Sequence, residues 1–181
     1  MSGRYRADEG RIAGRLVGSE EFRAALSRHP AGVVVVTPTA GGLRTAVTVT
    51  SFTSASASPP LVSFYLKKES SSCGVLRASE WFAVSFLESG QRDVAATCAR
   101  SGVDRFAPSE AWEDGPFGLP LLKGATAHLV CRREKFVEVG DHFMVVGGVI
   151  DVAVRDAGRP LLYCDRSYAD IFQSNHSDRN P

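Results

Sequence analysis

The chain has 181 residues, of which 44% are hydrophobic and 23% are charged, and its formal net charge is +1. These values are typical of a soluble globular protein and favour one domain with a sizeable core. The near-zero net charge argues against nucleic acid as a partner, and no apolar run is long enough to suggest a membrane span.

The first half of the chain alternates apolar runs with turn residues. Ser19 is a candidate N-cap for a helix over 20–28, which Pro30 follows. The continuous apolar run GVVVVTPT predicts a strand over 32–39, and Ala40-Gly41-Gly42 predicts a hairpin turn into a strand over 43–52.

The second half predicts further strands and two short helices. The expected strands are 61–66, 81–87, 125–137, 143–154 and 161–163, and the expected helices are 70–78 and 91–100. Strands dominate and hairpin connections are frequent. The pattern therefore predicts a mainly β fold, an antiparallel barrel with a few peripheral helices.

Both ends of the chain are expected to lie outside the domain, which we place at 19–172. Residues 1–18 form a polar, basic lead-in, predicted to be disordered, without the apolar core of a secretory signal. Residues 173–181 have the composition of a flexible tail.

The cysteines and histidines are dispersed. The four cysteines are Cys73, Cys98, Cys131 and Cys164, and the four histidines are His29, His128, His142 and His176. No pair has the spacing of a zinc or redox site, so no metal is expected. Four reduced, mostly buried thiols in a cytoplasmic protein are the simplest interpretation.

The most informative segment is rich in small hydroxyl residues. Residues 45–52 read TAVTVTSF and are followed by TSASASPP, between two runs with strand character. Such a loop can bring its backbone against a flat polar ligand, and its hydroxyls can donate or accept hydrogen bonds along the ligand's edge.

A second segment, Lys67-Lys68-Glu69-Ser70-Ser71-Ser72, precedes a predicted helix. Free N–H groups at a helix start, with serine hydroxyls and lysines, suit a phosphate group. The alternative is a serine-capped surface helix with solvated lysines. The chain contains neither GxxxxGK[ST] nor GxGxxG, so no P-loop or Rossmann site is indicated.

The third segment is Gly140-Asp141-His142, between two predicted strands. Gly140 permits a tight turn, and Asp141 can orient the imidazole of His142 toward a substrate at the strand end. The alternative is a polar turn whose histidine is merely exposed.

Together these segments resemble the flavin reductase-like family, the short-chain reductase components of two-component flavin monooxygenases. The resemblance covers 22–168 and rests on the order of several motifs. These are GVVVVT, TVTSFTSAS, the paired prolines, SSS, Asp104-Arg105-Phe106, GLPLL at 118–122, Gly140-Asp141-His142, and PLLY at 160–163 with Tyr168.

The resemblance implies a split β-barrel, a homodimer and a set of site residues. The residues expected around the isoalloxazine and ribityl chain are Thr48, Val49, Thr50, Ser51, Ser54, Ala55 and Ser56. Those expected near the phosphates or the nucleotide end are Lys67, Ser70, Ser71, Ser72, Arg105 and Phe106, and Tyr168 is a further candidate. His142 is expected on the nicotinamide side, as the catalytic residue.

The function implied is an NAD(P)H-dependent flavin reductase. Hydride would pass from NADH to FAD or FMN, and the reduced flavin would leave for a separate flavin-dependent monooxygenase. No arginine cluster suited to a 2′-phosphate is evident, which favours NADH over NADPH. Departures from the family pattern at Ala46, Ala55 and Ser58 leave FAD and FMN both open.

Two alternatives keep the flavin but change its use. In one, the flavin stays bound as a prosthetic group that reduces another acceptor. In the other, a split-barrel protein stores or senses flavin without hydride transfer.

Overall fold

The computed structural model describes residues 16–156 and 158–170. The tail expected at 173–181, and residues 1–15 of the expected lead-in, lie outside these ranges.

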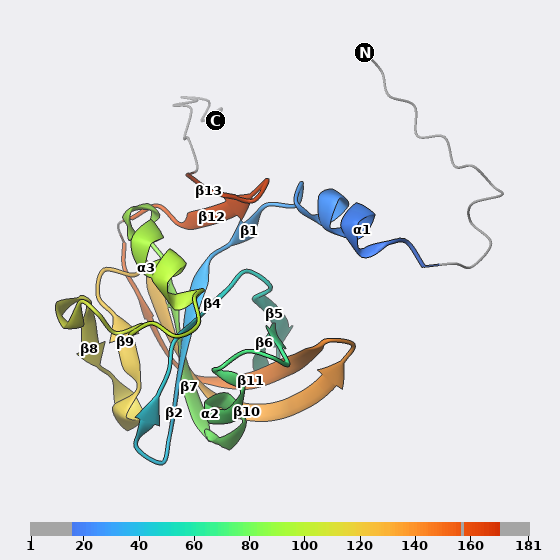
Figure 1. Cartoon of the computed structure of the whole chain (residues 1–181). Coiled ribbons are helices and arrows are strands. Elements are labelled where there is room, and N and C mark those ends of the chain that lie inside the picture. Colours follow the sequence, from blue (N-terminus) through green and yellow to red (C-terminus); the bar gives the residue numbers. More distant parts are fainter. Residues whose placement is uncertain (1–15, 157, 171–181) are drawn as a thin grey trace, which may run out of the picture.

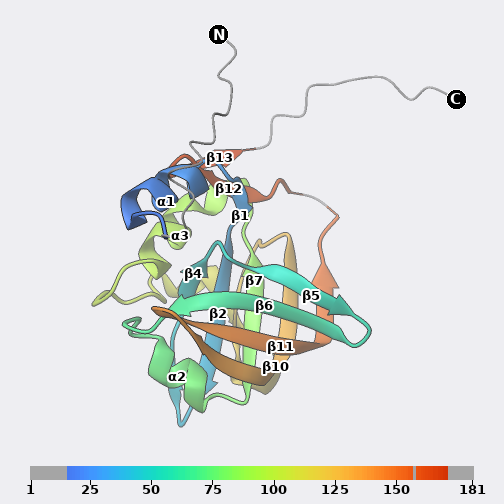
Figure 2. The ribbon, with the colours of Figure 1, turned by 90° about the vertical axis from the view of Figure 1, so that its right-hand side faces the viewer.

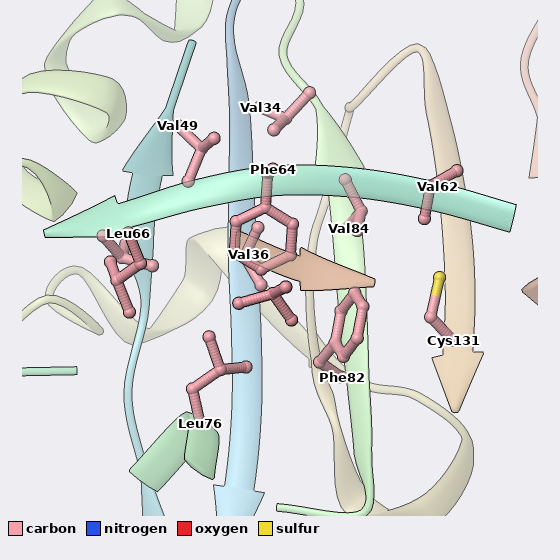
Figure 3. Close-up of a cluster of buried hydrophobic side chains, with 12 residues drawn as sticks. Val34, Val36, Val49, Val62, Phe64, Leu66, Leu76, Phe82, Val84 and Cys131 are labelled. Carbon is pink, nitrogen blue, oxygen red and sulfur yellow. The ribbon is translucent and has the colours of Figure 1, made fainter. Parts of the chain in front are cut away.

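An antiparallel sheet of eight strands forms the body of the molecule (Figures 1 and 2). Its strands are β2 (Val34–Ala40), β3 (Leu43–Arg44), β4 (Val47–Val49), β5 (Thr53–Ala57), β6 (Pro60–Lys67), β7 (Trp81–Phe86), β10 (Ala127–Val139) and β11 (His142–Val154). The order across the sheet is β3-β2-β7-β10-β11-β6-β5, and β4 also pairs with β2. The sheet curls so that β6 crosses over β2 and β7 (Figure 3).

Smaller elements surround this sheet (Figure 1). They are α1 (Ser19–Leu26), α2 (Cys73–Ala78), α3 (Arg92–Cys98), the three-stranded sheet of β1 (Ala31–Gly32), β12 (Leu161–Cys164) and β13 (Ser167–Asp170), and the pair β8 (Trp112–Asp114) and β9 (Pro120–Leu122). Among the described residues, single 3₁₀ turns occupy Ser89–Gln91, Ser109–Ala111 and Pro116–Gly118. The prediction of a mainly β fold with short peripheral helices is confirmed, and the curled sheet agrees with a split barrel.

The apolar run of β2 is explained by burial on both of its faces. Val34 and Val36 point into the space enclosed by the curled sheet, whereas Val33 and Val35 pack toward α3 and β12. Successive side chains of a strand point to opposite faces, so a strand covered on both sides needs apolar residues at every position.

Two clusters of buried side chains make up most of the core. The cluster inside the curled sheet contains Val34, Val36, Val47, Val49, Val62, Phe64, Leu66, Leu76, Phe82, Val84, Cys131 and Val145 (Figure 3). The other contains Val33, Val35, Ala46, Leu87, Ala95, Cys98, Phe106, Trp112, Leu122 and Leu161. Burial raises the pKa of both Cys98 and Cys131 to about 12, so these thiols stay protonated.

Several predicted elements differ in detail. The strand expected over 43–52 is divided into β3 and β4, and Thr45, between them, turns its hydroxyl toward Ser72 and Arg105. The hydroxyl-rich residues Thr53–Ala57 form strand β5, because they pair with β6 across a register shift between Ser54 and Ser56. Helix α1 is preceded by Gly18 as its N-cap rather than by Ser19.

Neither the β8–β9 pair nor β13 was predicted. Each is only three or four residues long and is stabilised by packing against the main sheet or β12. Within the described residues, no helix combines the length and the apolar character needed to cross a membrane.

Candidate functional site

A pocket of about 530 Å³ lies beside β4, at the ends of β6 and α3, and at the start of β11. We call it the first pocket. It is lined by Val47, Thr48, Val49, Thr50, Ser51, Tyr65, Leu66, Lys67, Glu69, Ser70, Ala99, Ser101, Arg105 and His142. It therefore brings together parts of all three segments that the sequence marked, with Arg105 added from the loop after α3.

The hydroxyl groups of Thr48, in β4, and Ser51, just after it, stabilise the pocket wall itself. The Thr48 hydroxyl donates to the Ala95 carbonyl oxygen at 2.6 Å, which ties β4 to α3. The Tyr65 N–H donates to Ser51 Oγ at 2.9 Å, and the Ser51 hydroxyl donates to the Tyr65 carbonyl at 3.2 Å. These bonds hold the backbone of Val49 to Ser51 in place, and Thr50 is exposed.

A second pocket, of about 650 Å³, meets the first at Thr50 and Ser51. We call it the second pocket. It lies among α1, β1 and the β12–β13 hairpin, and its lining includes the aromatic rings of Phe52 and Tyr163. Its basic lining residues are Arg23, His29 and Arg166. Thr50 and Ser51 thus form the ridge between two adjoining concave surfaces.

The segment from Lys67 to Ser72 uses its backbone differently from the expectation. The N–H of Ser70 donates to the Lys67 carbonyl at 3.0 Å, and the N–H of Ser72 donates to Ser70 Oγ at 3.3 Å. Lys68 forms an ion pair with Glu138. Helix α2 begins only at Cys73, so this turn does not present a row of free amides.

Arg105 is the best-anchored cation of the first pocket. Its Nη1 donates to Ser72 Oγ at 2.7 Å and to Thr45 Oγ1 at 3.1 Å, and its Nη2 donates to Ser71 Oγ at 3.0 Å. Nε and Nη2 also donate to the Arg100 carbonyl oxygen, at 2.9 and 2.6 Å. Among residues 16–156 and 158–170, no carboxylate forms an ion pair with Arg105, so none of them neutralises its charge.

His142 is the first residue of β11 and pairs across the sheet with Lys67 of β6. Its Nδ1 lies 2.7 Å from Asp141 Oδ1, and this hydrogen bond, with the charge of the imidazole, lowers the pKa of the Asp141 carboxyl. Because the carboxylate engages Nδ1, the Nε2 atom is the ring nitrogen left for a ligand. Asp141 thus orients His142 at the edge of the first pocket.

Comparison with known proteins identifies the family. Residues 26–171 match the family model described as flavin reductase like domain. The chain belongs to the flavin reductase-like family.

Individual relatives cover most of the chain. An NADH:FMN oxidoreductase of Rhodococcus qingshengii is 40% identical over 152 residues, which is 82% of this chain and 79% of the relative. The reductase component of 4-hydroxyphenylacetate 3-monooxygenase from Thermus thermophilus is 37% identical, over 82% of this chain and 94% of the relative.

One solved structure in the family carries ligand fragments. An NADH:FAD oxidoreductase of Streptomyces globisporus, in complex with NAD and FAD fragments, is similar to this chain with a TM-score of 0.81. The two are 34% identical, and the match covers 90% of this chain and 99% of that one.

Not every residue that the family resemblance suggested reaches the first pocket of this flavin reductase-like chain. Ser54, Ala55 and Ser56 lie on β5 and do not line it. Phe106 is buried. The centroid of its ring lies 5.0 Å from that of Trp112, and the Arg44 guanidinium packs over the Phe106 ring.

Tyr168 and two serines also lie apart from the pocket lining. The Tyr168 ring packs on Tyr163 at 5.4 Å, and burial raises the pKa of its phenol. The hydroxyls of Ser71 and Ser72 accept hydrogen bonds from the guanidinium of Arg105. The predicted residues that do line the first pocket are Thr48, Val49, Thr50, Ser51, Lys67, Ser70, Arg105 and His142.

Sequence reasoning missed other members of the site. Tyr65 and Leu66 directly precede Lys67 on β6, so the outward position of Tyr65 could have been inferred from strand alternation. Ala99 and Ser101 carried no signal, because only the packing of α3 against β4 brings them to the pocket. Thr45 belongs to the hydroxyl-rich segment, but nothing in the sequence marked it as a partner of Arg105. Within the described ranges, no group of three or more His, Cys, Asp or Glu side chains could hold a metal ion.

Proposed function

We propose that this chain transfers a hydride from NADH to FAD or FMN and supplies the reduced flavin to a separate flavin-dependent monooxygenase. The observation that carries the proposal is the first pocket, in which Arg105 and the Asp141-oriented His142 line one concave surface. The named activities of relatives as similar as 40% support it.

The residues of the first pocket suit a flavin nucleotide. Its volume of about 530 Å³ falls in the range of small-molecule sites. The backbone of Val49 to Ser51 offers a flat polar wall. Arg105 and Lys67 offer positive charge for a phosphate group.

The flavin would supply the redox chemistry by accepting the hydride from the nicotinamide. The chain's own contribution is to bind and orient. Arg105 would bind phosphate through its unneutralised charge, and His142 would position the nicotinamide through Nε2 while Asp141 holds the ring. Because the two ligands carry the reactive atoms, the protein contributes mainly by orienting them.

The two alternatives are less well supported. Storage or sensing of flavin without hydride transfer gives no role to an oriented histidine at the pocket edge. A permanently bound flavin that reduces another acceptor would require tight retention, whereas the first pocket adjoins a second concave surface at the exposed Thr50. The names of the relatives also favour a reductase.

The first prediction concerns flavin binding and turnover. Purified protein should bind FAD or FMN at about one per chain and oxidise NADH only when free flavin is added. The measurement is a fluorescence titration, followed by an assay that crosses NADH and NADPH with FAD, FMN and riboflavin. Binding without NADH oxidation would favour the storage or sensor function, and no binding of either flavin at micromolar concentration would reject the proposal.

We also propose a homodimer whose interface includes the end of β11. Ile150, Val152 and Val154 lie near the end of this strand and are 49%, 55% and 71% exposed, with Ile150 at a register shift in the pairing of β11 with β10. A group of exposed branched side chains at the end of a strand is typical of an interaction surface, and a two-fold partner would cover it.

The second prediction tests this assembly. Light scattering at micromolar concentration should give about twice the chain mass of 19.4 kDa, and Ile150→Lys combined with Val152→Lys should give one chain mass. Val103→Lys, at an exposed valine in a loop, is the matched control and should leave the dimer intact. A stable single-chain mass for the unmodified protein would reject the dimer.

The cytoplasm is the proposed location. All four cysteines are free thiols, two of them buried and two half-buried, as expected in a reducing compartment. The nucleotide substrates are available there.

A further inference from the structure

We propose that Thr45 and Ser72 are positioning residues, which act on a phosphate-bearing flavin only by holding Arg105 in place. The inference deepens the proposed function and rests on it. It assigns to Thr45, a member of the hydroxyl-rich segment, a role that the sequence did not suggest, and it changes the role expected of Ser72 from a phosphate ligand to a support for Arg105.

The Arg105 guanidinium is in direct contact with the hydroxyls of Thr45 and Ser72. Arg105 Nη1 donates to Ser72 Oγ at 2.7 Å and to Thr45 Oγ1 at 3.1 Å, and these two oxygens lie 3.0 Å from each other. The three residues come from the β3–β4 connection, the turn before α2 and the loop after α3. Three segments distant in sequence thus converge on one side of the guanidinium.

The remaining N–H groups of Arg105 also have hydrogen-bond acceptors. Nε and Nη2 both donate to the Arg100 carbonyl, and Nη2 also donates to Ser71 Oγ at 3.0 Å. A guanidinium has five N–H groups, and all five have an acceptor here. Every acceptor is a hydroxyl or a carbonyl, so the side chain is fixed in orientation while its full positive charge remains available to the pocket.

Ser71 and Ser72 differ in their access to a ligand. Ser72 is fully buried, and its Oγ is already engaged by both Arg105 and Thr45, so it cannot meet a ligand in the first pocket. Ser71 is exposed, and its bond to Nη2 is therefore the one that a ligand oxygen can replace or extend. The Ser71 hydroxyl accepts from the guanidinium and keeps its own hydrogen to donate to an anion.

The contacts of Arg105 indicate which ligand chemistry it suits. A fixed cation with neutral supports favours a phosphate monoester or a pyrophosphate, because binding need not break an existing ion pair. Riboflavin carries neither group. Loss of Thr45 or Ser72 should therefore weaken phosphorylated flavins and leave riboflavin unaffected.

The test is a double-mutant cycle on the full chain with FMN and riboflavin as probes. Thr45→Val and Ser72→Ala should each weaken FMN about 2- to 10-fold, and Arg105→Met should weaken it about 10- to 100-fold, with riboflavin unchanged within about twofold. Adding Thr45→Val or Ser72→Ala to Arg105→Met should cause no further loss, since the hydroxyls then have no charge to position.

Two further variants separate positioning from general damage to the fold. Thr45→Ser retains the hydroxyl and should bind FMN nearly as the unmodified chain does. Thr37→Val removes another buried hydroxyl, which donates to the Pro120 carbonyl away from the pocket, and should leave the ratio of FMN to riboflavin affinity unchanged.

The opposite results are equally distinct. Further weakening of FMN by Thr45→Val or Ser72→Ala in the Arg105→Met background would show that the hydroxyls contact ligand themselves, and would overturn the inference. Equal weakening of riboflavin would reduce them to structural residues. If the unmodified chain binds FMN no better than riboflavin, the inference fails while the proposed function stands; if it binds no flavin, both fail.

Discussion

Replacement of Gly147 by alanine is expected to lower the free energy of unfolding by about 1–3 kcal/mol, the usual cost of overpacking a tight core. A Cβ atom at Gly147 would lie 2.4 Å from Phe82 Cζ and 3.0 Å from Cys131 Cβ. Phe82 is fully buried and its ring packs edge-on against Phe64 at 5.6 Å, so it has no room to move away.

The neighbouring glycine provides the control. A Cβ at Gly148 would lie 3.0 Å from Glu134 Oε1, the end of a flexible side chain, so Gly148→Ala should change stability by less than about 0.5 kcal/mol. Urea unfolding of both variants measures the difference. Combining Gly147→Ala with Phe82→Leu should cost less than the sum of the two single changes, because the smaller side chain makes room. Equal stability of Gly147→Ala and Gly148→Ala would contradict the packing argument.

Replacement of His142 by alanine is expected to lower kcat/KM for NADH about 5- to 150-fold, which corresponds to one orienting hydrogen bond of about 1–3 kcal/mol. His142 lines the first pocket, and Asp141 fixes its ring from the opposite side through Nδ1. Flavin affinity should stay nearly intact, since the wall around Val49 to Ser51 and Arg105, the proposed phosphate ligand, are untouched. Steady-state kinetics and a flavin titration on the same protein measure the two effects separately.

Asp141→Asn is the companion variant for His142. The asparagine Oδ1 can still accept from Nδ1, so the loss should be smaller than for His142→Ala. A proton-donor role would appear as a rate that falls when the imidazolium loses its proton, a dependence missing from the alanine variant. Unchanged kinetics in both His142→Ala and His142→Asn would make His142 an exposed turn residue without a part in the reaction.

Local patterns along the chain predicted much of the fold. The run of valines before Thr37 predicted β2, because a strand buried on both faces needs apolar side chains throughout. Gly41 and Gly42 predicted the following turn, and both have positive φ, a conformation that other residues adopt only at a cost. The order of several short motifs, each weak by itself, indicated the family that the comparisons confirm.

The lining of the first pocket was predicted in part. His142, Lys67 and the residues from Thr48 to Ser51 were located from their position beside strands, and they do line the first pocket. Ser54 and Ser56 were assigned with them because they share the same hydroxyl-rich composition. Their backbones instead pair with β6, and a periodicity of two in a run of small residues is too weak to show this from sequence.

The sequence by itself determined the class of fold, the family and which segments border the pocket, because hydrophobic periodicity and turn chemistry act over a few neighbouring residues. Only the tertiary structure decided the partners of Arg105. Thr45, Ser72 and Arg105 are separated by about thirty residues at each step, and they meet because β4, α2 and the loop after α3 pack at one end of the curled sheet. A hydroxyl that holds a guanidinium and one that binds a phosphate are identical in sequence, and they differ only in what the fold places beside them.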